Sequence, residues 1–94
     1  MNLLTNVLSS LLDVELLNKT AELTEELRDE ATKAGWPTIV VIQLEVQIKN
    51  DEFEVYYPSE VSEQVEILEY GTETTPPNPV IRNFMKSLNK RVTF

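Results

Sequence analysis

Residues 42–57 read IQLEVQIKNDEFEVYY and carry the pattern that decides the fold. Apolar and polar side chains alternate over 42–49 and again over 53–57, and a period of two is typical of a half-buried β-strand. If Asn50 and Asp51 form a two-residue turn, every apolar side chain falls on one face, whereas a shift by one residue would mix the faces. The pairs in this register are Lys49 with Glu52, Ile48 with Phe53, Val46 with Val55, and Leu44 with Tyr57. The sequence therefore predicts an antiparallel hairpin over 38–57, whose first strand runs from 38 to 49 because 39–42 is also apolar.

The preceding segment, residues 2–34, has the spacing of an amphipathic helix. Apolar side chains recur three and four positions apart, first as a wide stripe and then as a thinner one. The wide stripe comprises Leu4, Val7, Leu8, Leu11 and Leu12, and the thinner one Leu16, Thr20, Leu23, Leu27, Ala31 and Ala34. Polar residues at 18–20 leave open whether this is one helix or two. The stripe packs in the core of a small domain, or another subunit buries part of it. Gly35 and Pro37 predict the end of the helix.

The segment after the hairpin, residues 58–72, allows two interpretations. Ser59 can cap a short helix after Pro58. Helical spacing connects Val61, Val65 and Leu68, whereas strand alternation connects Val65, Ile67 and Glu69, and a segment this short does not decide between them.

The last part of the chain is predicted to be a linker followed by a helix. Residues 73–78 are polar and rich in proline, which makes an extended linker of limited flexibility. Asn78 followed by Pro79 is a start signal for a helix over 79–92, with Asn78 as its cap. The apolar stripe of that helix comprises Ile81, Phe84, Met85, Leu88 and Val92.

These elements predict a single α+β domain of 94 residues, with a long N-terminal helix, a hairpin-based antiparallel sheet and a C-terminal helix. Cysteine is absent, so no disulfide framework or thiolate metal site is expected, and the chain is compatible with the cytoplasm. The leucine-rich start lacks the positive region of a signal peptide and contains Asp13 and Glu15. Its polar residues at helical spacing also exclude a membrane span.

The charge is divided unevenly along the chain. Residues 1–73 contain all 16 acidic residues and 4 basic ones, which gives −12, whereas residues 74–94 contain 4 basic residues and no acid, which gives +4. An acidic body makes general nucleic-acid binding unfavourable, because that affinity comes from neutralising phosphates. The charge either forms a solvated surface that keeps the protein soluble, or it lets the basic end of one subunit meet the acidic face of another.

The residue inventory argues against catalysis. Histidine is absent, which removes the commonest general base and the histidine ligands of metal sites. Carboxylate pairs fall on faces expected to be exposed, without an apolar pocket to separate their pKa values. The acidic run 51–54 lacks the spacing and glycine of a calcium loop, and two glycines do not build a phosphate-binding loop. We therefore expect no catalytic, cofactor or metal site. Trp36 covers the core where helix meets sheet, or anchors an interface.

One stretch carries a resemblance to a known family. Residues 65–72, VEILEYGT, are followed by a proline-rich loop and by residues 78–84, NPVIRNF. Together they resemble the tail-completion, or neck, family of tailed bacteriophages, in which a segment ending in Glu-Tyr/Phe-Gly-Thr precedes a Pro-Pro-Phe-Leu/Ile-Arg-Pro entry to a final helix. The motif covers roughly residues 61–90, and the order of elements is similar over the whole chain. The sequence departs from the pattern at Val80, where an aromatic residue is commoner, and at Asn83, where proline is frequent. The usual Thr-Gly-x-Leu stretch before the first strand is replaced by residues 36–38, WPT.

The resemblance implies a structural virion protein without catalytic residues. Such proteins assemble in the host cytoplasm into rings at the head–tail junction or the top of the tail, with other neck, tail and connector proteins as partners. An acidic lumen would repel DNA and let it slide through without specific binding. The residues expected to act in assembly are Glu69, Tyr70, Gly71 and Thr72 as a conformational joint, Pro76, Pro77 and Pro79 as linker, Ile81, Arg82, Phe84 and Met85 as docking face, and Trp36. Arg82 is expected to pair with a carboxylate of an adjacent subunit.

A second function class fits the same composition. A small acidic binding protein could neutralise a basic enzyme, since opposite charge speeds association. A tight one-to-one complex with a basic partner would favour this alternative.

Overall fold

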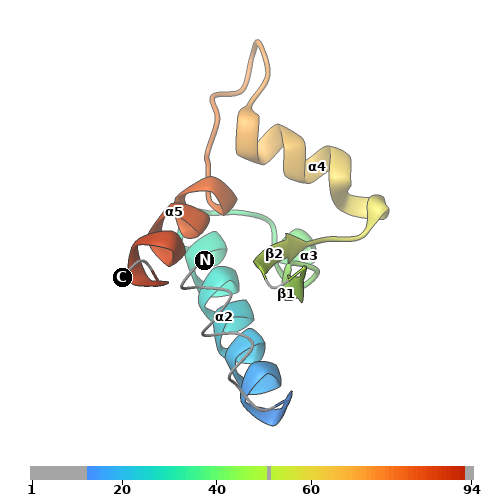
Figure 1. The fold of residues 1–94 in the computed structure, drawn as a ribbon. Helices are drawn as coiled ribbons and strands as arrows, with labels where there is room; N and C mark the ends of the chain where they lie inside the picture. The colour runs from blue at the N-terminus through green and yellow to red at the C-terminus, as the bar shows by residue number, and fades with distance from the viewer. Residues whose placement is uncertain (1–12, 51, 93–94) are drawn as a thin grey trace.

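The computed structural model describes residues 13–50 and 52–92, and it is α+β as the sequence predicts. The elements are connected in the order of Figure 1, where α5 lies along the C-terminal half of α2 and the chain between α4 and α5 extends away from the body before it returns. The helices and strands are α2 (Asp13–Lys33), α3 (Thr38–Val41), β1 (Glu45–Lys49), β2 (Glu52–Tyr56), α4 (Ser59–Tyr70) and α5 (Ile81–Val92).

The hairpin forms in the predicted register. β1 and β2 pair antiparallel, with Lys49 opposite Glu52 at the turn end and Val46 opposite Val55 further along. Asn50 has a φ of +54°, the left-handed conformation that a tight hairpin turn requires and that asparagine tolerates. The side chains of Val46 and Phe53 are buried on the face that packs against the helices.

The prediction of a strand over 38–44 is wrong, because residues 38–41 form the short helix α3 and β1 begins only at Glu45. The carbonyl oxygen of Pro37 accepts hydrogen bonds from the N–H groups of Val40 and Val41, both at 3.0 Å. Successive strand residues point to opposite faces, so a strand would bury only one of these two valines. The helical turn buries both and leaves Ile39 and Ile42 exposed.

Helix α2 is a single helix through residues 18–20, so within the described residues the polar run does not break it. The wide stripe predicted for the segment before Asp13 lies outside the described residues. The helix ends as predicted at Gly35, whose φ is +88°. The Gly35 N–H donates to the Thr32 carbonyl and the Trp36 N–H to the Ala31 carbonyl, both at 3.0 Å, which is the Schellman arrangement.

Residues 59–70 form helix α4, which settles the alternative between helix and strand. Val61 and Val65 are buried on one face of this helix, and Leu68 packs against the core from the same side. Ser59 lies inside the helix, and the cap position is occupied by Pro58 without a side-chain hydrogen bond. The predicted capping role of Ser59 is therefore wrong.

A single core joins these elements. Its buried side chains come from α2, α3, the hairpin, α4 and α5, and include Leu23, Leu27, Leu44, Val65 and Leu88. Two side chains of α2 also bind the backbone of the first strand and the residue before it: Thr24 Oγ1 accepts from the Val46 N–H at 2.9 Å, and Arg28 Nε donates to the Leu44 carbonyl at 2.9 Å.

Candidate docking site

The residue at the centre of the predicted joint, Glu69, caps helix α5 from the end of helix α4. Its side chain is buried, with 2% of its surface exposed. Oε1 accepts hydrogen bonds from the N–H groups of Val80 and Ile81 at 3.0 and 2.9 Å, and Oε2 accepts from the Arg82 N–H at 3.0 Å. These are N–H groups of the first turn, which have no partner inside the helix. A carboxylate at this position also meets the positive end of the helix dipole.

The capping role predicted for Asn78 is thus wrong, and α5 begins at Ile81, two positions later than the predicted Pro79. Asn78 instead connects the loop before α5 to α4 and to the segment between α2 and α3. Its backbone N–H donates to the Leu68 carbonyl at 2.8 Å, its Nδ2 donates to the Ala34 carbonyl at 2.8 Å, and its own carbonyl accepts from Trp36 Nε1 at 3.1 Å. The sequence gives only a weak signal for this role, because an Asn-Pro pair is typical of many turns.

Arg82 finds its carboxylate in its own chain, not in an adjacent subunit as predicted. Nε donates to Glu69 Oε2 at 2.9 Å, and Nη2 donates to the Glu69 backbone carbonyl at 2.7 Å. The guanidinium also lies 4.5 Å from the centre of the Tyr70 ring, within the range of a cation–π interaction. The side chain of Arg82 remains 46% exposed, so one face of this cluster is open to solvent.

The hydrogen bonds determine the charge state of Glu69. Burial by itself would raise the pKa of this carboxyl, because a low-dielectric environment disfavours the charged form. The hydrogen bonds from Arg82, Ile81 and Val80 favour that form more strongly and hold the pKa of Glu69 below its usual value. The group is therefore a carboxylate at neutral pH.

Gly71 and Thr72 fold the start of the linker into a tight turn. Gly71 has φ +76° and ψ −178°, a region that is essentially restricted to glycine. A Cβ at this position would lie 2.6 Å from the Thr75 carbonyl oxygen and 2.7 Å from the Pro77 nitrogen. Thr72 closes the turn: its Oγ1 accepts from the Thr75 N–H at 3.0 Å, and its N–H donates to the Thr75 carbonyl at 2.8 Å. The first part of the predicted extended linker is therefore compact.

Four of the residues predicted to act in assembly, Glu69, Tyr70, Ile81 and Met85, line one hollow of about 290 Å³ between β2, α4 and α5. The lining includes Tyr70, Ile81 and Met85, together with Val55 of β2 and Tyr57, the residue that follows this strand. Tyr70 is 61% exposed, and Ile81 and Met85 are partly buried against the core. We call this feature the apolar hollow.

The remaining predicted residues lie elsewhere. Trp36 and Phe84 are core residues, with 4% and 5% of their surfaces exposed, so neither presents a docking surface in this structure. Pro76 and Pro77 are exposed in the loop between α4 and α5. Pro79 is partly buried beside a second depression.

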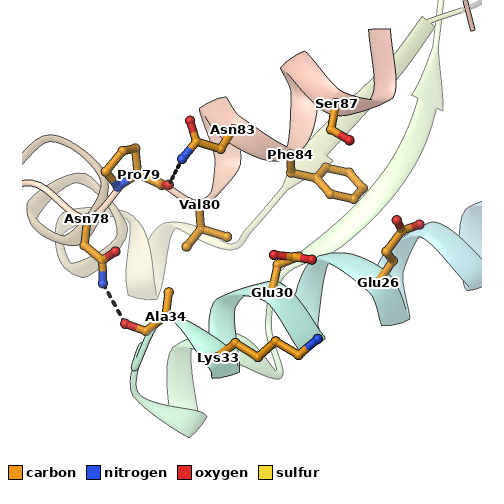
Figure 2. A pocket seen from close by; sticks show the side chains of 10 residues that line it. All are labelled: Glu26, Glu30, Lys33, Ala34, Asn78, Pro79, Val80, Asn83, Phe84 and Ser87. Atoms are coloured by element: carbon orange, nitrogen blue, oxygen red, sulfur yellow. Dashed lines mark hydrogen bonds between the residues drawn. The ribbon is translucent and has the colours of Figure 1, made fainter. Parts of the chain in front are cut away.

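That second depression is a polar groove of about 400 Å³ between α2 and α5 (Figure 2). Glu26, Glu30 and Lys33 border it from α2, and Asn83 and Ser87 border it from α5. The sequence does not predict this groove, because its two walls belong to segments far apart in the chain, whose packing is not visible in any local pattern.

Among residues 13–50 and 52–92, no group of three or more acidic side chains is arranged to hold a metal ion. In the same part of the chain, no helix is long and apolar enough to cross a membrane.

Comparisons with protein-family models, with curated proteins and with solved structures find no match to this chain.

Proposed function

We propose that this protein is a structural subunit of a tailed-phage virion, which completes the tail or neck by binding copies of itself and other particle proteins. The motif that suggests this function spans two segments of the chain, 65–72 and 78–84. In a protein that works by assembly, we expect the two halves of such a motif to contact each other and to form one structural unit.

The observation that carries the proposal is the contact between the two halves of the motif. Glu69, from the first half, accepts hydrogen bonds from the backbone and side chain of Arg82, from the second half, through Oε2 and its own carbonyl, while Oε1 accepts from the N–H groups of Val80 and Ile81. Gly71 permits the close turn between them. The motif residues thus form one connected unit that sets the position of α5 relative to α4.

The surface beside this unit is suited to a protein partner. Tyr70 and Arg82 lie at its edge, with a cation–π contact between them, and the apolar hollow adjoins it. Tyrosine and arginine are enriched at the centres of protein interfaces, and a partly buried methionine adapts to different partners. A neighbouring particle protein that inserts an apolar side chain would bury this surface.

Deletion of the gene from a phage genome that carries it tests the proposal. Electron microscopy of the resulting particles should show heads and tails that are not joined, or tails that end abnormally. Complementation with the normal gene should restore joined particles. A Met85→Asp variant, which places a charge in the apolar hollow, should complement poorly, whereas a Glu63→Gln variant on the exposed side of α4 should complement fully.

Normal particles after deletion would overturn the proposal. If the purified protein then formed a tight one-to-one complex with a basic enzyme, the acidic binding protein would be the better interpretation.

A further inference from the structure

The outer edge of β2, the side turned away from β1, carries backbone groups that are open to a partner. The Val46 N–H donates to Thr24 and not across the hairpin, so Val46 and Val55 are a pair that exchanges no hydrogen bonds. Such pairs alternate with hydrogen-bonded ones, so the backbone of Phe53 has the same orientation as that of Val55. The N–H and C=O groups of both residues therefore point away from β1. No other element among residues 13–50 and 52–92 forms a hydrogen bond with these groups.

The apolar hollow lies along this edge. Its lining includes the consecutive residues Phe53, Glu54 and Val55. Successive side chains of a strand point to opposite faces, so a hollow that touches all three residues reaches the backbone edge of β2. On the inner side the hollow continues to Ile81 and Met85 of α5, which are only partly buried. The inner face of the sheet thus extends beyond β2 as apolar surface that is partly open to solvent.

A further strand would use both features at once. Among the described elements, only β1 lies close along β2. Neighbouring strands of a sheet lie about 4.8 Å apart, and their side chains on one face are aligned. The inward side chains of a strand added beside β2 would therefore lie next to Phe53 and Val55 and fill the hollow.

The outer face of β2 determines which charge such a strand should have. Glu52, Glu54 and Tyr56 share this face, and all three are exposed. Glu54 lies opposite Gln47 and has no basic partner among the described residues. Opposite charges on neighbouring strands stabilise a sheet and like charges destabilise it. A lysine or arginine can also lie over the ring of Tyr56. The outward side chains of the added strand should therefore be basic.

A second copy of β2 fits this edge less well. If two β2 strands paired antiparallel about their centres, Glu54 of one copy would lie opposite Glu54 of the other. This places like charges directly opposite each other.

We propose that the outer edge of β2 binds an extended segment of a partner protein in which apolar and basic side chains alternate. The backbone of that segment pairs with Phe53 and Val55, its apolar side chains enter the hollow, and its basic side chains lie beside Glu52 and Glu54. The inference rests on the proposed function, which makes the partner another particle protein, and it names how that partner is recognised.

The test begins with amide hydrogen exchange of the full chain, measured by nuclear magnetic resonance without a ligand. The outward N–H groups of Phe53 and Val55 should exchange faster than the Glu54 N–H, which is bonded to β1. Equal protection of the three would show that the edge is already covered, and would overturn the inference. Protection that rises with protein concentration would identify a second copy as the occupant, and would overturn it as well.

A synthetic peptide of about nine residues, in which lysine and valine alternate, is then added. At saturation it should slow the exchange of Phe53 and Val55 at least about tenfold and leave Glu54 unchanged. A second peptide has glutamate in place of lysine, and a third has the same lysines and valines grouped in two blocks. Neither should slow this exchange. No effect of the first peptide, or an equal effect of either control, would overturn the inference.

Variants of the chain separate charge from strand pairing. Glu54→Lys should weaken binding of the lysine peptide at least about fivefold and should let the glutamate peptide bind. Glu63→Lys makes the same change in net charge on the exposed side of α4 and should bind the lysine peptide like the unmodified chain. Equal binding by these two variants would contradict the proposed site.

Val55→Pro tests the backbone contact. Proline removes an outward N–H without removing a bond to β1, so this variant should lose peptide binding, and circular dichroism shows whether it is folded. The comparison of Glu54→Lys with Glu63→Lys decides alone if the proline variant does not fold. A failure in these experiments concerns the mode of contact only. The deletion experiment decides separately whether the protein belongs to a virion.

Discussion

Glu69 caps α5, although most capping residues lie directly beside the helix in the sequence and Glu69 does not. The cap of α5 comes from a residue 11 to 13 positions earlier, at the end of another helix. Holding the carboxylate there also holds α4 against the start of α5. One side chain therefore links helix formation to tertiary packing.

Replacing Glu69 with alanine should lower the free energy of unfolding by about 2–3 kcal/mol, because loss of a helix cap costs up to about 2 kcal/mol and buried N–H groups are left without partners. The change should appear as a shift of the midpoint of urea unfolding. Glu66→Ala, on the exposed side of the same helix, should change the free energy by less than about 0.5 kcal/mol. Equal effects of the two substitutions would contradict the capping role.

The pKa of Glu69 also predicts how stability depends on pH. Because the pKa is lower in the folded chain than its usual value of 4.5, the unfolded chain takes up this proton first as the pH falls. The contribution of Glu69 to stability should be complete above that value and decline as the pH falls through the lower, folded pKa. Urea unfolding at pH 7 and pH 3 measures the decline, which should be smaller in Glu69→Gln than in the unmodified chain. An unchanged decline in that variant would mean that other carboxylates dominate.

The two glycines should respond differently to alanine. Both have positive φ, but a Cβ at Gly35 meets nothing within 4 Å, whereas at Gly71 it meets backbone atoms at 2.6 and 2.7 Å. Gly35→Ala should cost about 1–2 kcal/mol, the price of the left-handed conformation. Gly71→Ala should cost clearly more, because the turn itself must shift. Thermal unfolding of both variants tests the order, and a smaller loss at Gly71 would contradict the observed geometry.

Two side chains of α2 bind backbone groups of β1 and of the residue before it. Thr24 Oγ1 is the acceptor for the buried Val46 N–H. Thr24→Val keeps the size of the side chain but removes this acceptor, so it should cost about 1–3 kcal/mol, the penalty of an unsatisfied buried donor. Amide hydrogen exchange should be faster at Val46 in this variant. Thr32→Val, at an exposed position of α2, provides the control.

The elements differ in how well the sequence predicts them, and the reasons are physical. The hairpin register follows from strict alternation, because one shift would expose Val46 and Phe53. The end of α2 follows from Gly35. The helical turn α3 could not be predicted, since 39–42 has no periodicity and its conformation depends on which side chains the core accepts. The sequence predicts that α5 starts at Pro79, whereas it starts at Ile81, because its cap is supplied by a distant residue.

The described helices and strands share one core, which predicts cooperative unfolding. Trp36 is the single tryptophan, it is buried, and it binds Asn78 near the start of α5. Its fluorescence should therefore change in the same transition as the helical circular dichroism, with coincident midpoints. Two separate midpoints would show that α4 and α5 unfold independently of the sheet and α2.

The candidate site was predictable in part. The motif points to residues 69–72 and to Arg82, and of these Glu69 and Tyr70 contact Arg82. Their partners were not predictable, because a charge in a sequence does not reveal whether its counter-charge lies in the same chain. The sequence predicts Phe84 in a docking face for a similar reason, since an apolar stripe does not distinguish a core from a surface; for Trp36, whose core and interface alternatives the sequence leaves open, the core alternative is the observed one.

The bonds from α2 to the first strand have a consequence for aggregation. A sheet of two strands has two open edges, and each edge is a template for strands of other molecules. On the β1 side, the outward Val46 N–H and the adjoining Leu44 carbonyl are already occupied by Thr24 and Arg28. The start of the β1 edge is therefore occupied by α2, so a strand from another molecule would add more readily beside β2.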